Sequence, residues 1–208
     1  MLVKEMAYLD GTRVLVWRLE EETSQLLALC RGAGIDCEDL AKLPVKRLRE
    51  RAAERLLLCH AFGRPVTLSH SDQGAPYIDC EKVNVSISHT MRMVVLALNE
   101  KHAIGIDAEQ RDRAQVLRVR DKFLNDSEKH FVDLGNQDAH VMAWTAKEAI
   151  IKVNRDSSMD WTHGICLDPF TPDPVETVFT ARCGDHRYRL SARSLDGHYI
   201  TLATPALD

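Results

Sequence analysis

The sequence lacks any hydrophobic run long enough to cross a membrane. Its longest uninterrupted apolar stretch covers only residues 93–98. A membrane helix needs roughly 20 apolar residues in succession. Charged residues, among them Lys4, Asp10 and Arg13, also interrupt the N-terminal region and leave no apolar segment of a secretory signal. We therefore expect neither membrane insertion nor export.

Cysteine motifs and a strong charge of one sign are missing as well. The six cysteines form no Cys-x-x-Cys pair, so we expect reduced thiols in a cytoplasmic protein. With 27 basic and 31 acidic residues the net charge is −4, which argues against sequence-blind nucleic-acid binding. The sequence has no Gly-x-x-x-x-Gly-Lys loop, no dinucleotide fingerprint and no Gly-x-Ser-x-Gly elbow. The common classes of nucleotide triphosphatase, nicotinamide enzyme and serine hydrolase therefore lose support.

The hydrophobic pattern predicts an α+β chain with two halves. A helix is predicted over residues 44–62, beginning at Pro44 and ending at Gly63, with a basic face opposite its buried stripe. A turn at 99–102 predicts that strands over 91–98 and 103–109 form an antiparallel meander. The other predicted elements are a strand over 83–88, helices near 113–124, 127–134 and 138–153, and strands near 175–182, 186–193 and 197–203.

The predicted strand 103–109 places two carboxylates on one face. Because side chains alternate along a strand, Gly105, Asp107 and Glu109 point the same way. Like charges about 7 Å apart are tolerated if both reach water or if a cation lies between them. Gly105 on the same face indicates that a ligand approaches the backbone there. The alternative interpretation is a solvated edge strand with two harmless acids.

The predicted helix 138–153 carries an acid and a base on its apolar stripe. On a helical projection Trp144, Glu148 and Lys152 share one arc with Val141 and Ile151. An exposed glutamate–lysine pair is the ordinary interpretation of such spacing. Here the apolar neighbours draw the pair inward, where charges persist only if other charges hold them. A metal ion with a phosphate meets that need.

Three carboxylates without a cluster of cysteine or histidine suit a hard cation. Magnesium binds one to three protein oxygens and keeps water and phosphate oxygens as further ligands, whereas zinc is a poor fit. His89 follows Ser88 at the end of the alternating strand. A histidine in that position has either a structural role or, beside a metal–phosphate site, donates a hydrogen bond to an anion.

These motifs together resemble those of the 4′-phosphopantetheinyl transferases. The resemblance rests on Gly-Ile-Asp-Ala-Glu at 105–109 and Trp-Thr-Ala-Lys-Glu-Ala-Ile-Ile-Lys at 144–152. Asn-Val-Ser-Ile-Ser-His-Thr at 84–90 looks like the upstream segment of the larger, surfactin-synthetase-activating type. The resemblance implies an α+β monomer of two similar halves, residues 1–106 and 107–208, related by a pseudo-twofold axis, with coenzyme A and magnesium bound in the cleft between them.

The resemblance also implies roles for individual residues. By similarity, Asp107, Glu109 and Glu148 hold magnesium and Lys152 binds phosphate. Our mechanistic hypothesis adds that Glu148, between the metal and an apolar wall, acts as the base for the serine proton. The family commonly has Gly-Lys-Pro where this chain has Gly74-Ala75-Pro76, so one cationic contact to the nucleotide is missing or replaced. Lys46 and Arg47 are candidates for the 3′-phosphate. The full set of expected coenzyme A ligands is Arg55, Lys46, Arg47, Gly74, Ala75, Pro76, Ser88, His89, Lys147 and Lys152.

The function implied is that of a holo-acyl-carrier-protein synthase. The enzyme would transfer the phosphopantetheine arm of coenzyme A to a serine of an acyl or peptidyl carrier protein and release adenosine 3′,5′-bisphosphate. The basic segment 111–122 is the candidate docking surface for the acidic carrier, and charge reversal at Arg113 and Arg120 is expected to weaken docking. Two alternatives remain open at this point: a non-catalytic coenzyme A-binding protein and a magnesium-dependent phosphohydrolase.

Overall fold

The chain divides into two compact units. The computed structural model describes residues 2–72, 74–79, 81–156 and 158–206. Its units are Met1–Lys101 and His102–Asp208. The expected boundary after residue 106 falls inside strand β7 (Gly105–Gln110), all of which lies in the second unit. Gln73 of the predicted turn and Cys80 of the cysteine set lie outside the described residues.

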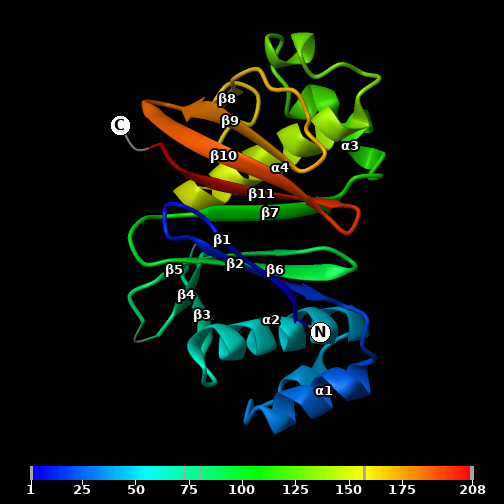
Figure 1. The fold of residues 1–208 in the computed structure, drawn as a ribbon, viewed down its shortest axis with the longest axis vertical. Helices are drawn as coiled ribbons and strands as arrows, with labels where there is room; N and C mark the ends of the chain where they lie inside the picture. The colour runs from blue at the N-terminus through cyan, green and yellow to red at the C-terminus, as the bar shows by residue number, and fades with distance from the viewer. Residues whose placement is uncertain (1, 73, 80, 157, 207–208) are drawn as a thin grey trace. The chain divides into compact units, whose positions relative to one another are not determined.

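The first unit is an antiparallel sheet with helices on one face. The strand order is β1-β2-β6-β5, and Figure 1 shows α1 and α2 on the same side of this sheet. A separate small hairpin joins β3 to β4. The elements are β1 (Leu2–Ala7), β2 (Arg13–Arg18), α1 (Thr23–Gly32), the 3₁₀ turn η1 (Leu40–Lys42), α2 (Val45–Phe62), β3 (Leu68–His70), β4 (Pro76–Ile78), β5 (Asn84–His89) and β6 (Met93–Asn99).

Helix α2 has the ends that the sequence predicts. Pro44 is its N-cap, and Gly63 ends it with a φ of 68°, a left-handed conformation that glycine adopts without strain. Leu48 and Leu56 lie on the buried face, as predicted. The same helix also buries two carboxylates, Glu50 and Glu54, which the apolar pattern did not indicate.

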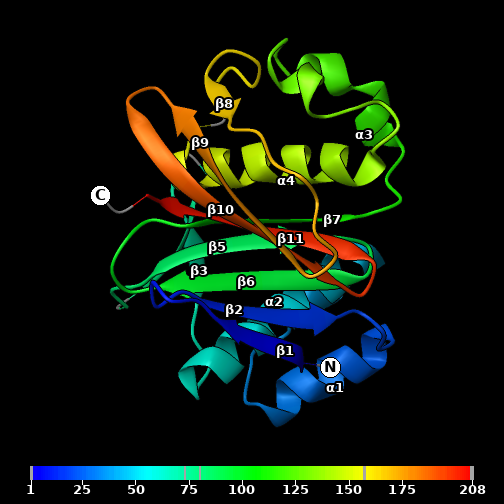
Figure 2. The ribbon, with the colours of Figure 1, turned by 45° about the horizontal axis from the view of Figure 1, so that its top comes forward.

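The second unit is a five-stranded antiparallel sheet with one long helix against it. The strand order is β7-β11-β10-β9-β8, and Figure 2 shows α4 lying along the sheet. The predicted helices near 113–124 and 127–134 shorten to α3 (Gln115–Arg118) and the 3₁₀ turns η2 (Arg120–Lys122) and η3 (Glu128–His130). The remaining elements are α4 (Gln137–Asn154), β8 (Ile165–Leu167), β9 (Glu176–Cys183), β10 (His186–Leu195) and β11 (His198–Pro205).

The predicted meander of residues 91–98 and 103–109 is wrong. Strand β6 pairs with β2 on one side and β5 on the other, so both its edges are occupied. Strand β7 pairs instead with β11, at the end of the chain. The turn at 99–102 therefore leads from one sheet into another. Local sequence cannot show this, because the partner of β7 is far away along the chain.

The two units repeat one topology, and the predicted α+β class is confirmed. In the first unit, β2 is followed by α2 and then by the hairpin β5–β6, whose second strand returns to pair with β2. In the second unit, β7 is followed by α4 and later by the hairpin β10–β11, whose second strand returns to pair with β7. The central helices α2 and α4 both have 18 residues.

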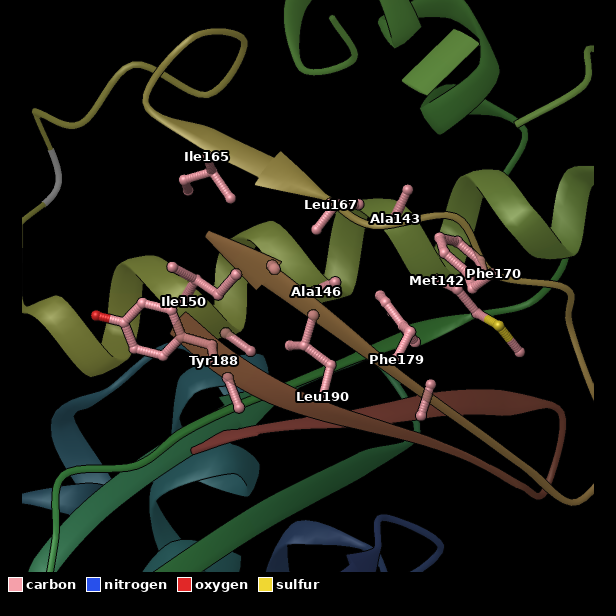
Figure 3. Close-up of a cluster of buried hydrophobic side chains, with 14 of the residues drawn as sticks. Met142, Ala143, Ala146, Ile150, Ile165, Leu167, Phe170, Phe179, Tyr188 and Leu190 are labelled. Carbon is pink, nitrogen blue, oxygen red and sulfur yellow. The ribbon is translucent and has the colours of Figure 1, made fainter. Parts of the chain in front are cut away.

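A hydrophobic cluster fixes how α4 is rotated against its sheet. Figure 3 shows side chains of α4 meeting those of β8, β9 and β10. Because one face of the helix is committed to this core, its other residues must face elsewhere. In the described part of the chain, no helix combines the length and hydrophobicity that a bilayer span requires. The labelled residues of the cluster are Met142, Ala143, Ala146, Ile150, Ile165, Leu167, Phe170, Phe179, Tyr188 and Leu190.

Candidate active site

Gly105 brings helix α4 into direct contact with strand β7. A Cβ atom at this position would lie 1.9 Å from the backbone oxygen of Ala149 and 2.9 Å from the nitrogen of Val153. The absence of a side chain at Gly105 therefore lets the backbone of α4 pack directly on β7. The expectation that a ligand approaches the backbone at Gly105 is wrong, because the helix occupies that space. This close approach places the side chains that follow along β7 beside those of α4.

Asp107 of β7 and Lys152 of α4 form an ion pair. The Lys152 Nζ atom lies 2.8 Å from Asp107 Oδ1 and also donates to the backbone oxygen of Ile106 at 2.9 Å. The Asp107 side chain is 9% exposed and that of Lys152 is 28% exposed. The pair therefore joins the two predicted motifs, which are separated by more than thirty residues of sequence.

Glu148 lies in the same group of charges. Burial raises the pKa of Glu148, and the nearby Asp107 carboxylate raises it further, while Lys152 and Arg113 act in the opposite direction. A carboxyl group held in this way takes up a proton more readily than an ordinary glutamate does. That property suits a general base, which needs a pKa closer to the working pH.

Glu109, the third predicted carboxylate, is held by Arg113. The two side chains form an ion pair, and the Glu109 side chain is 17% exposed. The Arg113 guanidinium also lies over the Trp144 ring, 5.9 Å from its centroid. Arg113 thus belongs to the acidic site, although the sequence assigned it to a docking surface.

The carboxylates fit a divalent cation by their chemistry. Asp107, Glu109 and Glu148 supply the hard oxygen donors that magnesium prefers, and the Asp107 carboxylate lies near enough to Glu148 to raise its pKa. Within the described ranges, however, no three Asp, Glu, His or Cys side chains are already grouped to hold a metal ion. The compensating positive charge comes from Lys152 and Arg113.

Lys147 does not belong to this group, which corrects its expected role as a coenzyme A ligand. Its side chain is fully buried, and Nζ donates to Glu128 Oε2 at 2.7 Å, the backbone oxygen of Trp161 at 2.7 Å and that of Ile165 at 2.9 Å. An ammonium group has three donors, and all three are used. Burial lowers the pKa of Lys147, and the Glu128 carboxylate opposes that shift.

Arg55, an expected phosphate ligand in the first unit, carries an intramolecular partner. Its guanidinium makes two bonds to the Asp39 carboxylate, at 2.9 and 2.6 Å, and one to the backbone oxygen of Asp36 at 2.6 Å. The hydrogen bonds from Arg55 hold the pKa of Asp39 below its usual range. A phosphate at Arg55 would have to displace Asp39 from this bidentate pair.

The other expected cations of the first unit lie along α2 and β5 and also face carboxylates. Lys46 and Arg47 both approach Glu50. His89 Nε2 lies 3.2 Å from Glu54 Oε2. Burial acts to raise the pKa of Glu54, but His89 and Arg51 together hold it below its ordinary value. Each of these basic side chains therefore lies beside a buried carboxylate of α2.

The expected nucleotide turn is a tight loop before β4. Gly74 has a φ of 79°, and its N–H donates to the Ser71 oxygen at 2.8 Å. The Ala75 N–H donates to Ser71 Oγ at 3.1 Å, and Pro76 begins β4. Ser88 is buried within β5, next to His89. The sequence thus located this turn correctly, but its role in ligand binding stays a prediction.

An aromatic pocket lies on the same side of α4 as the carboxylates. Trp144, one helical turn before Glu148, packs against Trp161 with ring centroids 4.8 Å apart and edge-on against Phe123 at 5.3 Å. Together with segment 113–123 these rings enclose about 260 Å³. Trp161 was not foreseen, because it lies in a segment without a periodic pattern. The lining residues are Arg113, Gln115, Val116, Val119, Lys122, Phe123, Trp144 and Trp161.

The fold and the site define an α+β domain with carboxylates and a lysine gathered between a strand and a helix. Residues 103–203 match the sequence model of the 4′-phosphopantetheinyl transferase superfamily. The match covers almost all of the second unit, and this part of the chain is similar to that superfamily. The superfamily consists of transferases that use coenzyme A, act on carrier proteins and typically require a divalent metal ion. No curated protein matches the chain.

Proposed function

We propose that this protein transfers the phosphopantetheine arm of coenzyme A to a serine hydroxyl of an acyl or peptidyl carrier protein. The observation that carries the proposal is the grouping of Asp107, Glu148 and Lys152, which come from two distant motifs. The repeated topology of the two units agrees with the internally duplicated, surfactin-synthetase-activating type. We further propose that the enzyme is a cytoplasmic monomer.

In the proposed reaction the serine oxygen attacks the phosphorus that carries the pantetheine arm. A new oxygen–phosphorus bond forms, the bond from this phosphorus to the bridging oxygen breaks, and adenosine 3′,5′-bisphosphate leaves. Glu148 takes the serine proton, directly or through water, because its burial beside Asp107 favours the protonated form. Asp107, Glu109 and Glu148 would hold magnesium, whose chemistry is the neutralisation of charge on the diphosphate.

Lys152 has the position to stabilise charge on the phosphates. Its contacts in the described part of the chain use two of the three N–H groups, on Asp107 and on the Ile106 carbonyl. The third N–H group is then left for a phosphate oxygen. A preorganised cation of this kind stabilises the transition state without reorientation during the reaction.

Mass spectrometry of the carrier protein tests the proposal directly. The protein is incubated with coenzyme A, magnesium and a panel of apo carrier proteins, and we expect the mass of one phosphopantetheine arm on at least one of them. Nucleotide release from coenzyme A without any carrier would instead indicate a phosphohydrolase. Calorimetric binding of coenzyme A without transfer to any carrier would indicate a non-catalytic binding protein. Either result would replace the transferase proposal.

The aromatic pocket is the proposed docking site for the carrier protein. It combines apolar walls with the exposed cation Lys122, which suits an acidic partner with an apolar contact residue. Arg113 is a poor probe of docking because it also holds Glu109. Lys122 has no such second role among its described contacts.

Reversing the charge of Lys122 is expected to weaken docking selectively. The Lys122→Glu variant should raise the KM for the carrier by roughly 3- to 10-fold, through loss of about 1 kcal/mol of favourable electrostatics. The KM for coenzyme A should stay unchanged. Steady-state kinetics at two salt concentrations measure both values. Arg182→Glu, on an exposed position of β9 away from the pocket, is the matched control. Equal changes in both KM values would contradict this docking site.

A further inference from the structure

The buried side chains of Glu128 and Lys147 tie four separate segments of the second unit together. Both side chains are fully buried. Lys147 of α4 donates to Glu128, to the Trp161 carbonyl and to the Ile165 carbonyl. Glu128 in turn accepts from the backbone N–H of Asn125 at 2.9 Å and of Leu167 at 2.8 Å. The pair thus joins α4 to the turn before η3, to the loop that carries Trp161, and to β8.

Such a network specifies an arrangement more than it adds stability. Removing two charges from water costs desolvation energy that offsets much of their mutual attraction. A well-packed apolar pair in the same place is often as stable. What an apolar pair cannot supply is direction, because only hydrogen bonds select particular carbonyl and N–H groups. An ion pair at this place in an apolar core therefore indicates that particular segments must be held in position.

One segment held by this network is the loop carrying Trp161. Among its described residues, 155–156 and 158–164, the loop contains no helix or strand. The bond from Lys147 to the Trp161 carbonyl joins the backbone of this loop directly to α4. The Trp161 ring, on the same residue, packs on Trp144 and forms a wall of the aromatic pocket.

Lys147 and Glu148 are adjacent on α4 and project about 100° apart around the helix axis. Lys147 therefore reaches the network on one side of the helix while Glu148 belongs to the charged group on another. We infer that Lys147, through its buried ion pair with Glu128, is a positioning residue that holds Trp161 against Trp144 and so shapes the pocket for the acceptor protein. The inference about the acceptor rests on the proposed function.

The test uses a double variant that removes both charges. Lys147→Met alone would leave the buried Glu128 carboxylate unpaired, and this single variant has the greater risk of misfolding. Glu128→Gln combined with Lys147→Met retains an acceptor oxygen for the Leu167 N–H but frees the Trp161 carbonyl. The control is Thr145→Val combined with Thr201→Val, which removes another buried hydrogen bond of α4, 2.6 Å long, with no described contact to Trp161. Both double variants are made in the full chain.

Tryptophan quenching and kinetics are measured on the same proteins. A Trp17→Phe background leaves Trp144 and Trp161 as the two tryptophans, whose emission is excited selectively over that of tyrosine. For the Glu128/Lys147 variant we expect at least twofold stronger acrylamide quenching and a roughly tenfold higher KM for the carrier. The kcat and the KM for coenzyme A should stay within about threefold of the parent. The Thr145/Thr201 control should change neither quenching nor the KM for the carrier.

Two results would overturn the inference. One is a folded Glu128/Lys147 variant with the parent's quenching and kinetics. The other is a fall in kcat with a rise in both KM values, in proportion to the loss of thermal stability in the variant and in the control alike. That result would assign the pair a structural role alone. If the parent protein transfers no arm to any carrier, the proposed function fails, and the quenching comparison by itself still decides whether Lys147 positions Trp161.

Discussion

Replacing Gly105 by alanine is expected to destabilise the protein and to remove most of its activity. The new Cβ would meet the backbone oxygen of Ala149 at 1.9 Å, and backbone atoms of a packed helix cannot move aside as a flexible side chain does. We expect a loss of about 3 kcal/mol in the free energy of unfolding. Because α4 must shift away from β7, Glu148 moves relative to Asp107, and kcat should fall by roughly 100-fold.

Urea denaturation and transfer kinetics measure these two effects. Gly135→Ala is the matched control in the same unit, because a Cβ at Gly135 meets nothing within 4 Å. Its stability should stay within about 0.5 kcal/mol of the parent protein. A Gly105→Ala protein as stable as this control would contradict the direct packing of α4 on β7.

Replacing Glu148 by glutamine is expected to separate activity from stability. The amide cannot accept the serine proton, so kcat should fall by roughly 100- to 10,000-fold. The same change removes a buried charge beside Asp107, so the free energy of unfolding should stay equal or rise by about 1 kcal/mol. A site that holds like charges together for function gains stability when one of them is neutralised.

Thermal denaturation and single-turnover transfer assays check both directions of the Glu148→Gln effect. The control is Glu100→Gln, an exposed glutamate in the turn after β6, which should change neither property. Full activity of Glu148→Gln would remove Glu148 from the mechanism. A loss of activity accompanied by a matching loss of stability would show that Glu148 acts on the fold rather than on the reaction.

The local elements of this fold were predictable because short-range patterns define them. Pro44 and Gly63 set the ends of α2, and alternating residues predicted β5. The pairing of β7 was not predictable, because its partner β11 lies almost one hundred residues later. A hydrophobic pattern predicts which face of a strand is buried, but it does not predict which strand pairs with it.

The candidate site shows the same division. Helical spacing predicted that Glu148 and Lys152 share one face of α4. Strand alternation predicted that Asp107 and Glu109 share one face of β7. Helical spacing could not show that the side chain of Lys147, the neighbour of Glu148, is buried in the core and pairs with Glu128. The sequence also gave no sign that Arg55 and His89 face the carboxylates of Asp39 and Glu54.

By itself the sequence determined the types of chemistry present, since residue identity and spacing along one element decide which side chains share a face. Spacing placed carboxylates on a strand and a lysine on a helix, and the resemblance of these motifs to a known family implied a transferase. Only the tertiary structure decided which of these charges meet. The contact of α4 with β7 at Gly105, and the buried bonds of Lys147, depend on segments that come together only when the chain folds.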